Sequence, residues 1–377
     1  MKKHILIASF VLILFSCEKE KQKEVSLLDA NDFTALIDEK NVSLYTLESE
    51  NGIYMQVTNL GGRVVTLWTP DRKGNYEDIV LGYENIDRYI HNEGERFLGP
   101  VVGRFANRIA NGQFTLDGVT YQLPINNNGQ TLHGGLKGLD MVVWNVDEVS
   151  KDRIKFSYLS PDGEDGFPGN LQLEMIYTLT PENELKIVYE ATTDKPTVVN
   201  LSHHGIFNLK GEGNGTITDH ILTIYADYIT PVTEVLIPTG EIISVENTPF
   251  DFRKPTAIGE RIDTPNEQLK HGAGYDHNWV VSKENQTEIK HVATLHEPTN
   301  GRVMEVWSDQ PGIQFYSGNF FDGKVSGKYG KKQNYREALA LETQKFPDSP
   351  NHPDFPSTRL DPGETYMQTC IYKFSTK

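Results

Sequence analysis

The 377-residue sequence predicts an all-β fold, one large antiparallel β-sandwich with few short helices. Runs in which apolar and polar residues alternate recur along the chain, and this is the period of a half-buried strand. Gly, Pro, Asn and Asp separate the runs, as in turns, and helical periodicity is scarce. In such a fold we expect binding groups on loops at one edge or on the concave face of a curved sheet.

The clearest local element is a hairpin over residues 112–123, GQFTLDGVTYQL, whose Asp117-Gly118 pair is a strong two-residue turn signal. Short helical turns are expected at 86–90 and 136–141. The apolar run 366–374 holds Cys370, which we expect to pack inertly in the core. Further strands are predicted at 153–159, 171–179, 185–192 and 221–229.

The charge balance excludes two classes of partner. The formal net charge is -16, and Lys and Arg form no stripe along the sequence. Binding to nucleic acid or to an anionic membrane surface needs clustered basic side chains. No nucleic-acid partner is therefore expected.

The N-terminus has the pattern of an export signal. A basic start, Met1-Lys2-Lys3, precedes a short apolar stretch that ends Leu14-Phe15-Ser16-Cys17. This ending resembles the lipobox of bacterial lipoproteins, although Phe15 is unusual at its position; the alternative is an ordinary signal peptide with an incidental cysteine. We expect a signal peptide at 1–16, lipidated Cys17 with a flexible tether at 17–35, and a single domain at 36–377. The expected location is the cell envelope, with membrane contact only through the lipid.

Glu342 follows the apolar run 338–341 and precedes a loop with prolines at 347, 350, 353 and 356. The run is predicted to be a buried strand, and the prolines prevent its continuation. A carboxylate at such a boundary is partly removed from water, which raises its pKa towards the range of a useful general base. The alternative is a glutamate that accepts hydrogen bonds from loop amides.

Two further segments carry side chains suited to binding a ligand. Asn107 and Arg108, in GRFANRI, supply the donors and acceptor that neighbouring hydroxyls need, although an arginine here could instead form a structural ion pair. His133 lies in NNNGQTLHGG, whose glycines allow close backbone approach to a ligand. A lone histidine in such a loop is more often a loop hydrogen-bonding group.

His203 and His204 form a pair in VVNLSHHGIFNL. Adjacent strand residues face opposite sides, so only one of the two can enter a given site, and alternation does not say which. No H-x-x-x-H or C-x-x-C spacing accompanies them, so a metal site is not expected. Asp276 in GYDHNWVV and Gln314 in QPGIQFYSGNFF are further polar candidates, although Asp276 could simply cap a turn.

In order, GRFANRI, LHGG, SPDGEDGFPG, NLSHHGIFNL, GYDHN, QPGIQFYSGNF and LETQKFPDSPNHPDFPS resemble the aldose 1-epimerase (galactose mutarotase) family from about residue 40 to the C-terminus. The resemblance implies a galactose mutarotase-like supersandwich that interconverts the α and β anomers of free aldoses without a cofactor or metal ion. The implied partner is a monosaccharide, and the implied assembly is a monomer or weak dimer.

The resemblance also implies roles for individual residues. Glu342 corresponds to the general base, His204 to the general acid and His133 to a second active-site histidine. Sugar-binding positions fall on Asn107, Arg108, Asp276 and Gln314. Nearby carboxylates are then expected to keep His204 protonated, and nearby donors to keep Glu342 ionised and limit the rise of its pKa.

Three residues depart from the family pattern, which leaves sugar preference and rim contacts open. His203 stands in place of Asn, Ile206 in place of Tyr, and Phe167 in place of a frequent Tyr.

Three other functions remain as alternatives. A sugar-binding lipoprotein without activity would lose the acid or the base. A glycoside hydrolase would use two carboxylates, such as Glu342 and Asp276. A hexose-phosphate epimerase would need additional Arg or Lys for the phosphate.

Overall fold

The computed structural model describes residues 23–91 and 94–377. The predicted signal peptide, Cys17 and the first part of the predicted tether lie outside the described residues. Strands dominate the described chain, and its two α-helices, α1 (Ile86–Ile90) and α2 (Glu267–Gly272), are short. The all-β prediction is therefore confirmed.

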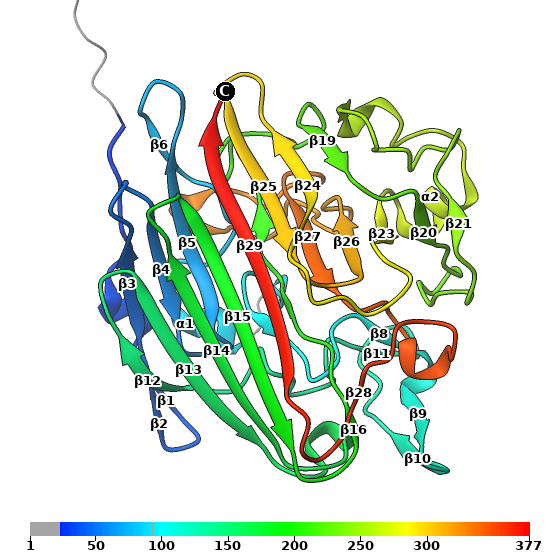
Figure 1. Ribbon diagram of the computed structural model, residues 1–377. Coiled ribbons are helices and arrows are strands. Elements are labelled where there is room, and N and C mark those ends of the chain that lie inside the picture. Colours follow the sequence, from blue (N-terminus) through cyan, green and yellow to red (C-terminus); the bar gives the residue numbers. More distant parts are fainter. Residues whose placement is uncertain (1–22, 92–93) are drawn as a thin grey trace, which may run out of the picture.

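A long sheet of nine antiparallel strands forms one layer, seen at the front of Figure 1. Its strands, in spatial order, are β12 (Asn145–Val149), β13 (Arg153–Ser160), β14 (Leu171–Leu179), β15 (Glu184–Thr193), β29 (Tyr366–Thr376), β25 (Arg302–Ser308), β24 (Lys290–His296), β19 (Ile221–Ile224) and β22 (Thr256–Ala257).

Two smaller sheets lie behind the long one (Figure 1). The six-stranded sheet contains, in spatial order, β18 (Ile206–Phe207), β27 (Leu339–Gln344), β26 (Gly312–Tyr316), β23 (Asp276–Val280), β20 (Tyr228–Thr230) and β21 (Ile243–Ser244). The four-stranded sheet contains β3 (Leu44–Glu48), β4 (Tyr54–Thr58), β5 (Arg63–Pro70) and β6 (Tyr76–Asp78).

Short two-stranded ladders complete the fold. They pair β1 (Ala35–Ile37) with β2 (Lys40–Val42), β9 (Gln113–Leu116) with β10 (Val119–Gln122), β8 (Arg108–Ile109) with β11 (Thr131–Leu132), β16 (Thr197–Val198) with β28 (Arg359–Leu360), and β7 (Val101–Val102) with β17 (Ser202–His203).

The main hydrophobic core lies between the long sheet and the two smaller ones. Alternate residues of the long sheet, such as Phe156 and Tyr372, pack against Leu67 of β5 and against Trp279 and Leu341 of the six-stranded sheet. The other face of the six-stranded sheet is turned away from this core. That outer face carries the polar side chains described below.

Most of the predicted strands are present with nearly the predicted bounds. The hairpin turns at Asp117 and Gly118, both with positive φ, and β14 covers the predicted range. Cys370 is buried in β29, as predicted. The helical turn at Ile86–Ile90 is α1, capped by the Asn85 side chain.

Three local predictions were wrong. Residues 136–141 form turns and bends without a helix. The predicted strand 221–229 is two strands, β19 and β20, which belong to different sheets. Glu342 does not end its strand, because β27 continues to Gln344 before the prolines interrupt the ladder.

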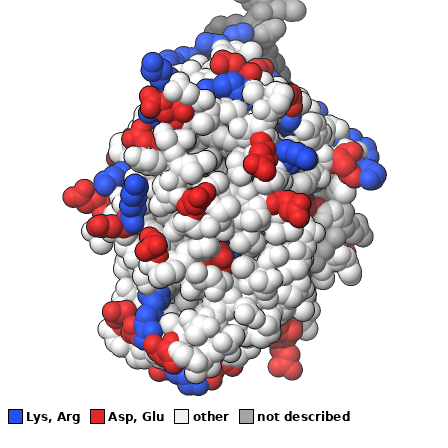
Figure 2. Space-filling model, turned by 90° about the vertical axis from the view of Figure 1, so that its right-hand side faces the viewer, with Lys and Arg blue, Asp and Glu red and all other residues white. Residues whose placement is uncertain are grey.

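On the face shown in Figure 2, acidic and basic side chains are interspersed, and the basic ones form no continuous stripe. None of the helices in the described ranges has the length and apolarity needed to cross a lipid bilayer.

Candidate active site

The register of the six-stranded sheet places one row of polar side chains on its outer face. Asn278 of β23 lies opposite Gln314 of β26, and Gln314 lies opposite Glu342 of β27. Directly opposed residues of antiparallel strands share a face. The neighbouring Trp279, Ile313 and Leu341 point into the core. Strand pairing alone therefore brings three residues that are distant in sequence into line.

The next row of the same face adds Asp276 of β23 and Tyr316 of β26, which also lie opposite each other. Gln314 joins the two rows, because its Nε2 donates to Asp276 Oδ1 at 2.7 Å. All three side chains are more than nine-tenths buried. Asp276 and Tyr316 form the floor of a pocket, and Gln314 holds the Asp276 carboxylate there.

The two adjacent histidines separate to opposite sides. His203 packs in the core, where its ring meets Tyr177 and Tyr372, and burial lowers its pKa to about 3. His204 lines the pocket, with its Nε2 3.7 Å from Oε1 of Glu342. Alternation predicted that only one histidine enters the site, and the fold places His204 there.

The loops on either side of β8 and β11 cover the floor. Arg108 pairs with Leu132 in this ladder, so Asn107 and His133 become neighbours. Gly134 follows at φ +94°, and a Cβ on it would lie 1.7 Å from the Gly103 carbonyl oxygen. Gly134 thus permits close contact between two backbone segments. The expectation from the sequence was instead close approach of the backbone to a ligand.

Of the two arginines in this segment, only Arg108 belongs to the pocket. Arg104 is a structural residue that donates to the Ser160 hydroxyl and to four backbone carbonyls of residues 160–169. The Arg108 guanidinium lies near Asp276 and Glu342, and burial lowers its pKa while both acids raise it. Its Nε has no hydrogen-bond partner within the described residues.

His133 is a neutral hydrogen-bond donor to the pocket. The Asn107 N–H donates to His133 Nδ1 at 3.1 Å, so the proton of the neutral ring is on Nε2. Burial lowers the His133 pKa well below its usual value, and His204, Arg108 and Arg96 lower it further. The ring also packs against Phe97, with centroids 4.6 Å apart.

The resulting pocket has a volume of about 260 Å³, and six of the seven residues predicted from the sequence line it. Gln314 does not line it but donates a hydrogen bond to Asp276, which does. The other lining residues of the pocket were not predicted: Glu95, Phe97, Asn127, Leu132, Tyr316 and Phe320. Asn127 belongs to the motif that contains His133, so that motif could have indicated it. Leu132 lies in the same motif, and Tyr316 and Phe320 lie in QPGIQFYSGNFF with Gln314. Glu95 and Phe97 lie in no motif singled out from the sequence.

The pocket concentrates buried polar atoms without partners. Among the described residues, they include Arg108 Nε, Asn127 Oδ1, His204 Nδ1 and Glu342 Oε2, and Gln314 Oε1 beside the pocket is unpaired too. Buried polar atoms are normally paired, and an unpaired one costs about 1–3 kcal/mol. Donors and acceptors in this mixture suit a ligand with several hydroxyl groups.

The protonation of Glu342 differs from the expectation. Burial, followed by the charge of Asp276, raises the pKa of Glu342 well above its usual value, and only Arg108 opposes this. Gln314, expected to donate to Glu342, donates to Asp276 instead. The prediction that surrounding donors would limit the rise was therefore wrong.

The protonation of His204 differs too. Burial lowers its pKa, and this outweighs the opposing effects of Glu95, the Phe97 backbone and Asp276. The carboxylates act in the expected direction but do not raise the pKa above its usual value. His204 and Glu342 therefore form a buried pair that shares one proton, and both the gain of a second proton and the loss of the first are costly.

His133, His204 and Glu342 have potential metal-ligand atoms within 4.8 Å of one another, so these three side chains could hold a divalent cation. Zinc binds imidazole nitrogen and carboxylate oxygen at about 2.0–2.2 Å and takes the unprotonated form of each. A metal ion here would compete with the protons that acid–base chemistry requires.

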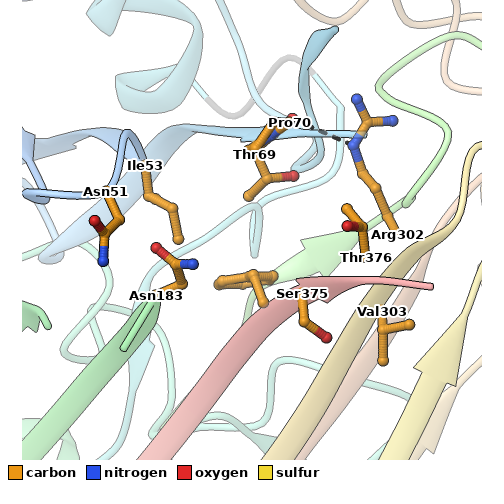
Figure 3. A pocket seen from close by; sticks show the side chains of 10 residues that line it. Asn51, Ile53, Thr69, Pro70, Asn183, Arg302, Val303, Ser375 and Thr376 are labelled. Atoms are coloured by element: carbon orange, nitrogen blue, oxygen red, sulfur yellow. Dashed lines mark hydrogen bonds between the residues drawn. The ribbon is translucent and has the colours of Figure 1, made fainter. Parts of the chain in front are cut away.

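A second cavity, of about 100 Å³, lies between β5 and the C-terminal strand β29 (Figure 3). Arg302 is its only charged lining residue, and the guanidinium donates to the backbone carbonyls of Thr69, Asn75 and Leu209. This cavity contains no carboxylate or histidine. This cavity therefore lacks the side chains of an acid–base pair.

The three departures from the family pattern all lie outside that pocket. Ile206 is fully buried in the cluster beneath α1, Phe167 packs with Phe105 and Phe114, and His203 lies in the main core. They alter packing and leave the pocket lining unchanged.

Comparison with known proteins identifies the family. A model of the aldose 1-epimerase family matches residues 43–373. Galactose mutarotase of Bos taurus is 44% identical over 334 residues, which cover 89% of this chain and 94% of the relative. Aldose 1-epimerase of Escherichia coli strain K12 is 35% identical over 333 residues, covering 88% and 94%.

Solved structures agree with the sequence comparison. A GalM/aldose epimerase homologue from C. elegans superposes with a TM-score of 0.82 at 30% identity, covering 89% of this chain and 99% of that one. Galactose 1-epimerase from Lactobacillus acidophilus gives 0.77 at 29% identity, covering 91% and 97%. The chain belongs to the aldose 1-epimerase family and is an isomerase that interconverts the anomers of aldoses.

Proposed function

We propose that this enzyme acts on free hexoses of the galactose and glucose type, with Glu342 as general base and His204 as general acid. The observation that carries this proposal is the 3.7 Å separation of His204 Nε2 and Glu342 Oε1 in a buried pocket. A sugar that presents O1 to the carboxylate and its ring oxygen to the imidazole would contact both groups at once. Galactose enters the proposal through the names of the mammalian relatives.

The reaction needs two proton transfers in each direction. Glu342, ionised, takes the proton of the C1 hydroxyl while His204, protonated, gives one to the ring oxygen. The C1–O5 bond breaks, the aldehyde forms, and the C1–C2 bond rotates. Reversal of both transfers closes the ring on the other face. A positioned acid or base contributes about 10²–10⁴-fold each.

The remaining polar residues hold the open chain in place during rotation. Arg108 and the His133 Nε2–H supply donors, and Asp276, coupled to Gln314, supplies an acceptor. The backbone of Asn107 fixes His133 by two hydrogen bonds. The Asn107 N–H donates to the His133 ring at Nδ1, and the Asn107 carbonyl accepts the backbone N–H of His133 at 2.9 Å. Orientation of this kind reduces the entropy lost on reaching the transition state.

The purified protein is expected to accelerate the equilibration of α-galactose and α-glucose. Polarimetry or NMR of freshly dissolved galactose, glucose, xylose and arabinose measures the effect directly. Failure to accelerate any of the four would contradict the proposed substrate class. A heat-denatured sample of equal concentration controls for catalysis by buffer and by surface side chains.

We further propose that Cys17 carries the lipid of a cell-envelope lipoprotein. The support is the sequence alone, Leu14-Phe15-Ser16-Cys17 after a short apolar run. The full chain, expressed in a bacterial host, is expected in the membrane fraction, and Cys17→Ala should abolish that association. Cys370→Ala is the matched control, because Cys370 is buried in β29 and should not affect fractionation. A wild-type chain found wholly in the soluble fraction would refute the anchor.

A further inference from the structure

Glu95 places a carboxylate in the pocket that has no part in the proton transfers proposed above. It lines the pocket with Phe97, His204 and Phe320 and is partly exposed. Its Oε1 accepts the Phe97 N–H at 3.0 Å. Within the described residues, Oε2 has no hydrogen-bond donor of its own. A carboxylate accepts about four hydrogen bonds, so acceptor capacity remains for a ligand.

The segment that carries Glu95 is held by its neighbours. The Glu95 carbonyl accepts the Tyr83 hydroxyl at 3.2 Å. Arg96 donates two hydrogen bonds, of 2.8 and 2.9 Å, to the buried carboxylate of Asp140. These contacts hold the chain at the Glu95 carbonyl and at the next residue, so the Glu95 carboxylate stays at the pocket.

The charge of Glu95 acts on one side of the pocket. It raises the pKa of His204, where it is the largest influence opposing burial, and it raises the pKa of Tyr316. The influences on Glu342 come instead from burial, Asp276 and Arg108. The geometry agrees: the Phe97 N–H donates to the Glu95 carboxylate, and the Phe97 ring packs against His204 with centroids 5.8 Å apart, so Glu95 lies on the His204 side of the pocket.

The proposed roles of His204 and Glu342 indicate which part of the sugar lies closest to Glu95. If His204 serves the ring oxygen and Glu342 the C1 hydroxyl, the His204 side faces away from C1. The ring oxygen's other neighbour is C5, which in an aldohexopyranose carries the exocyclic C6. The group on C6 is thus the part of the substrate that comes nearest to Glu95.

The rest of the pocket provides little to offset a negative charge at C6. Apart from the two histidines, its ionisable lining residues with acidic or basic side chains are three carboxyl groups, Glu95, Asp276 and Glu342, and one guanidinium, Arg108. Arg108 lies near Asp276 and Glu342, on the other side. Beside Glu95 the rim is aromatic: Phe320, 57% exposed, stacks on Tyr316 with ring centroids 5.8 Å apart. Aromatic faces attract cations and offer no attraction to anions.

We propose that Glu95 is a specificity-determining residue that selects the charge of the group on C6. A 6-hydroxyl donates to its free oxygen, a 6-ammonium is attracted, and a 6-carboxylate or 6-phosphate is repelled. The enzyme therefore accepts free hexoses and 6-amino-6-deoxyhexoses and discriminates against uronic acids and hexose 6-phosphates. This inference rests on the proposed orientation of the sugar by His204 and Glu342.

The test compares kcat/KM for galactose, galacturonate, galactose 6-phosphate and 6-amino-6-deoxygalactose in the wild type and in Glu95→Gln. Glutamine keeps the size of the side chain and an acceptor for the Phe97 N–H. We expect the substitution to raise the galacturonate-to-galactose ratio about tenfold and to lower the 6-amino-to-galactose ratio by a similar factor, as a unit charge a few ångströms away would. Because each ratio compares kcat/KM of two sugars on the same enzyme, any effect of Glu95 on His204 that is common to all sugars cancels.

Glu84→Gln, an exposed carboxylate outside the pocket, is the matched control for the change in net charge and should leave every ratio unchanged. Equal effects of Glu95→Gln on all four sugars would overturn charge selection at C6. A wild type inactive on galactose, glucose, xylose and arabinose would instead overturn the proposed substrate class, so the two failures are distinguishable.

Discussion

Glu342→Gln is expected to slow galactose mutarotation by about 10²–10⁴-fold, the contribution of one positioned general base. The amide preserves the size of the side chain and cannot accept the C1 proton. Sugar binding should persist in part, because Asn107, Arg108, His133 and Asp276 still line the pocket. We therefore expect the loss mainly in kcat, measured by polarimetry under saturating sugar.

The same substitution is expected to stabilise the protein. Burial raises the folded-state pKa of Glu342 above its unfolded value, so the folded protein binds the proton more tightly. Stability contributed by this group is fully present below the unfolded pKa and is lost as pH rises towards the folded pKa. The melting temperature of Glu342→Gln should thus exceed that of the wild type increasingly as pH rises above about 4.5.

Glu190→Gln is the matched control, since Glu190 is exposed on β15 in the long sheet. It should change neither rate nor melting temperature appreciably. Glu342→Gln with wild-type kcat would show that another group is the base. An activity loss accompanied by a lower melting temperature at neutral pH would point to misfolding.

His204→Asn is the second large effect, again about 10²–10⁴-fold in kcat, and it should also change the pH profile. The active form of the wild type holds one proton on the His204–Glu342 pair. A second proton at low pH, or loss of the proton at high pH, leaves the buried pair with an unbalanced charge. Burial raises the pKa of Glu342 and lowers that of His204, so the wild-type profile should be a broad bell.

Without His204, only the ionisation of Glu342 should remain. The profile of His204→Asn is therefore expected to rise once with pH, through a midpoint above the usual glutamate value, and to lack the alkaline decline. His291→Asn, on the long sheet where His291 stacks on Trp307, is the control and should keep the bell. A variant at His204 that retains both limbs would exclude this residue as the acid.

Much of the architecture could be predicted from local sequence, because alternation and turn residues determine strands such as β14 and the Asp117-Gly118 hairpin. The error at residues 221–229 has a simple cause. An apolar run shows that strands are present but does not show that the chain leaves one sheet after Ile224 and joins another at Tyr228. Sheet membership depends on pairing with β24 and β23, which are distant in sequence.

The residues of the pocket were likewise predictable where a local motif contains them and not where distant segments meet. Motifs indicated all seven predicted residues, and the family resemblance selected His204 where alternation left the choice open. Glu95 and Phe97 were missed because tertiary packing, rather than a local pattern, brings them to the rim. Phe320 lies in the motif of Gln314, but that motif does not show that its ring lines the pocket. The pKa of Glu342 was misjudged because the sequence shows which donors exist but not which acceptor each one binds. The Gln314 amide donates to Asp276 and leaves Glu342 without that hydrogen bond.

The opposed positions of Gln314 and Glu342 also restrict how the length of these strands can vary. Side chains alternate with a period of two, so one inserted or deleted residue before Glu342 within β27 would turn the carboxylate into the core and present Leu341 or Thr343 to the sugar. A change of two residues would keep the face but move the carboxylate away from Gln314. Among related enzymes, insertions and deletions should therefore be absent from this strand and accumulate in the loop that follows Gln344.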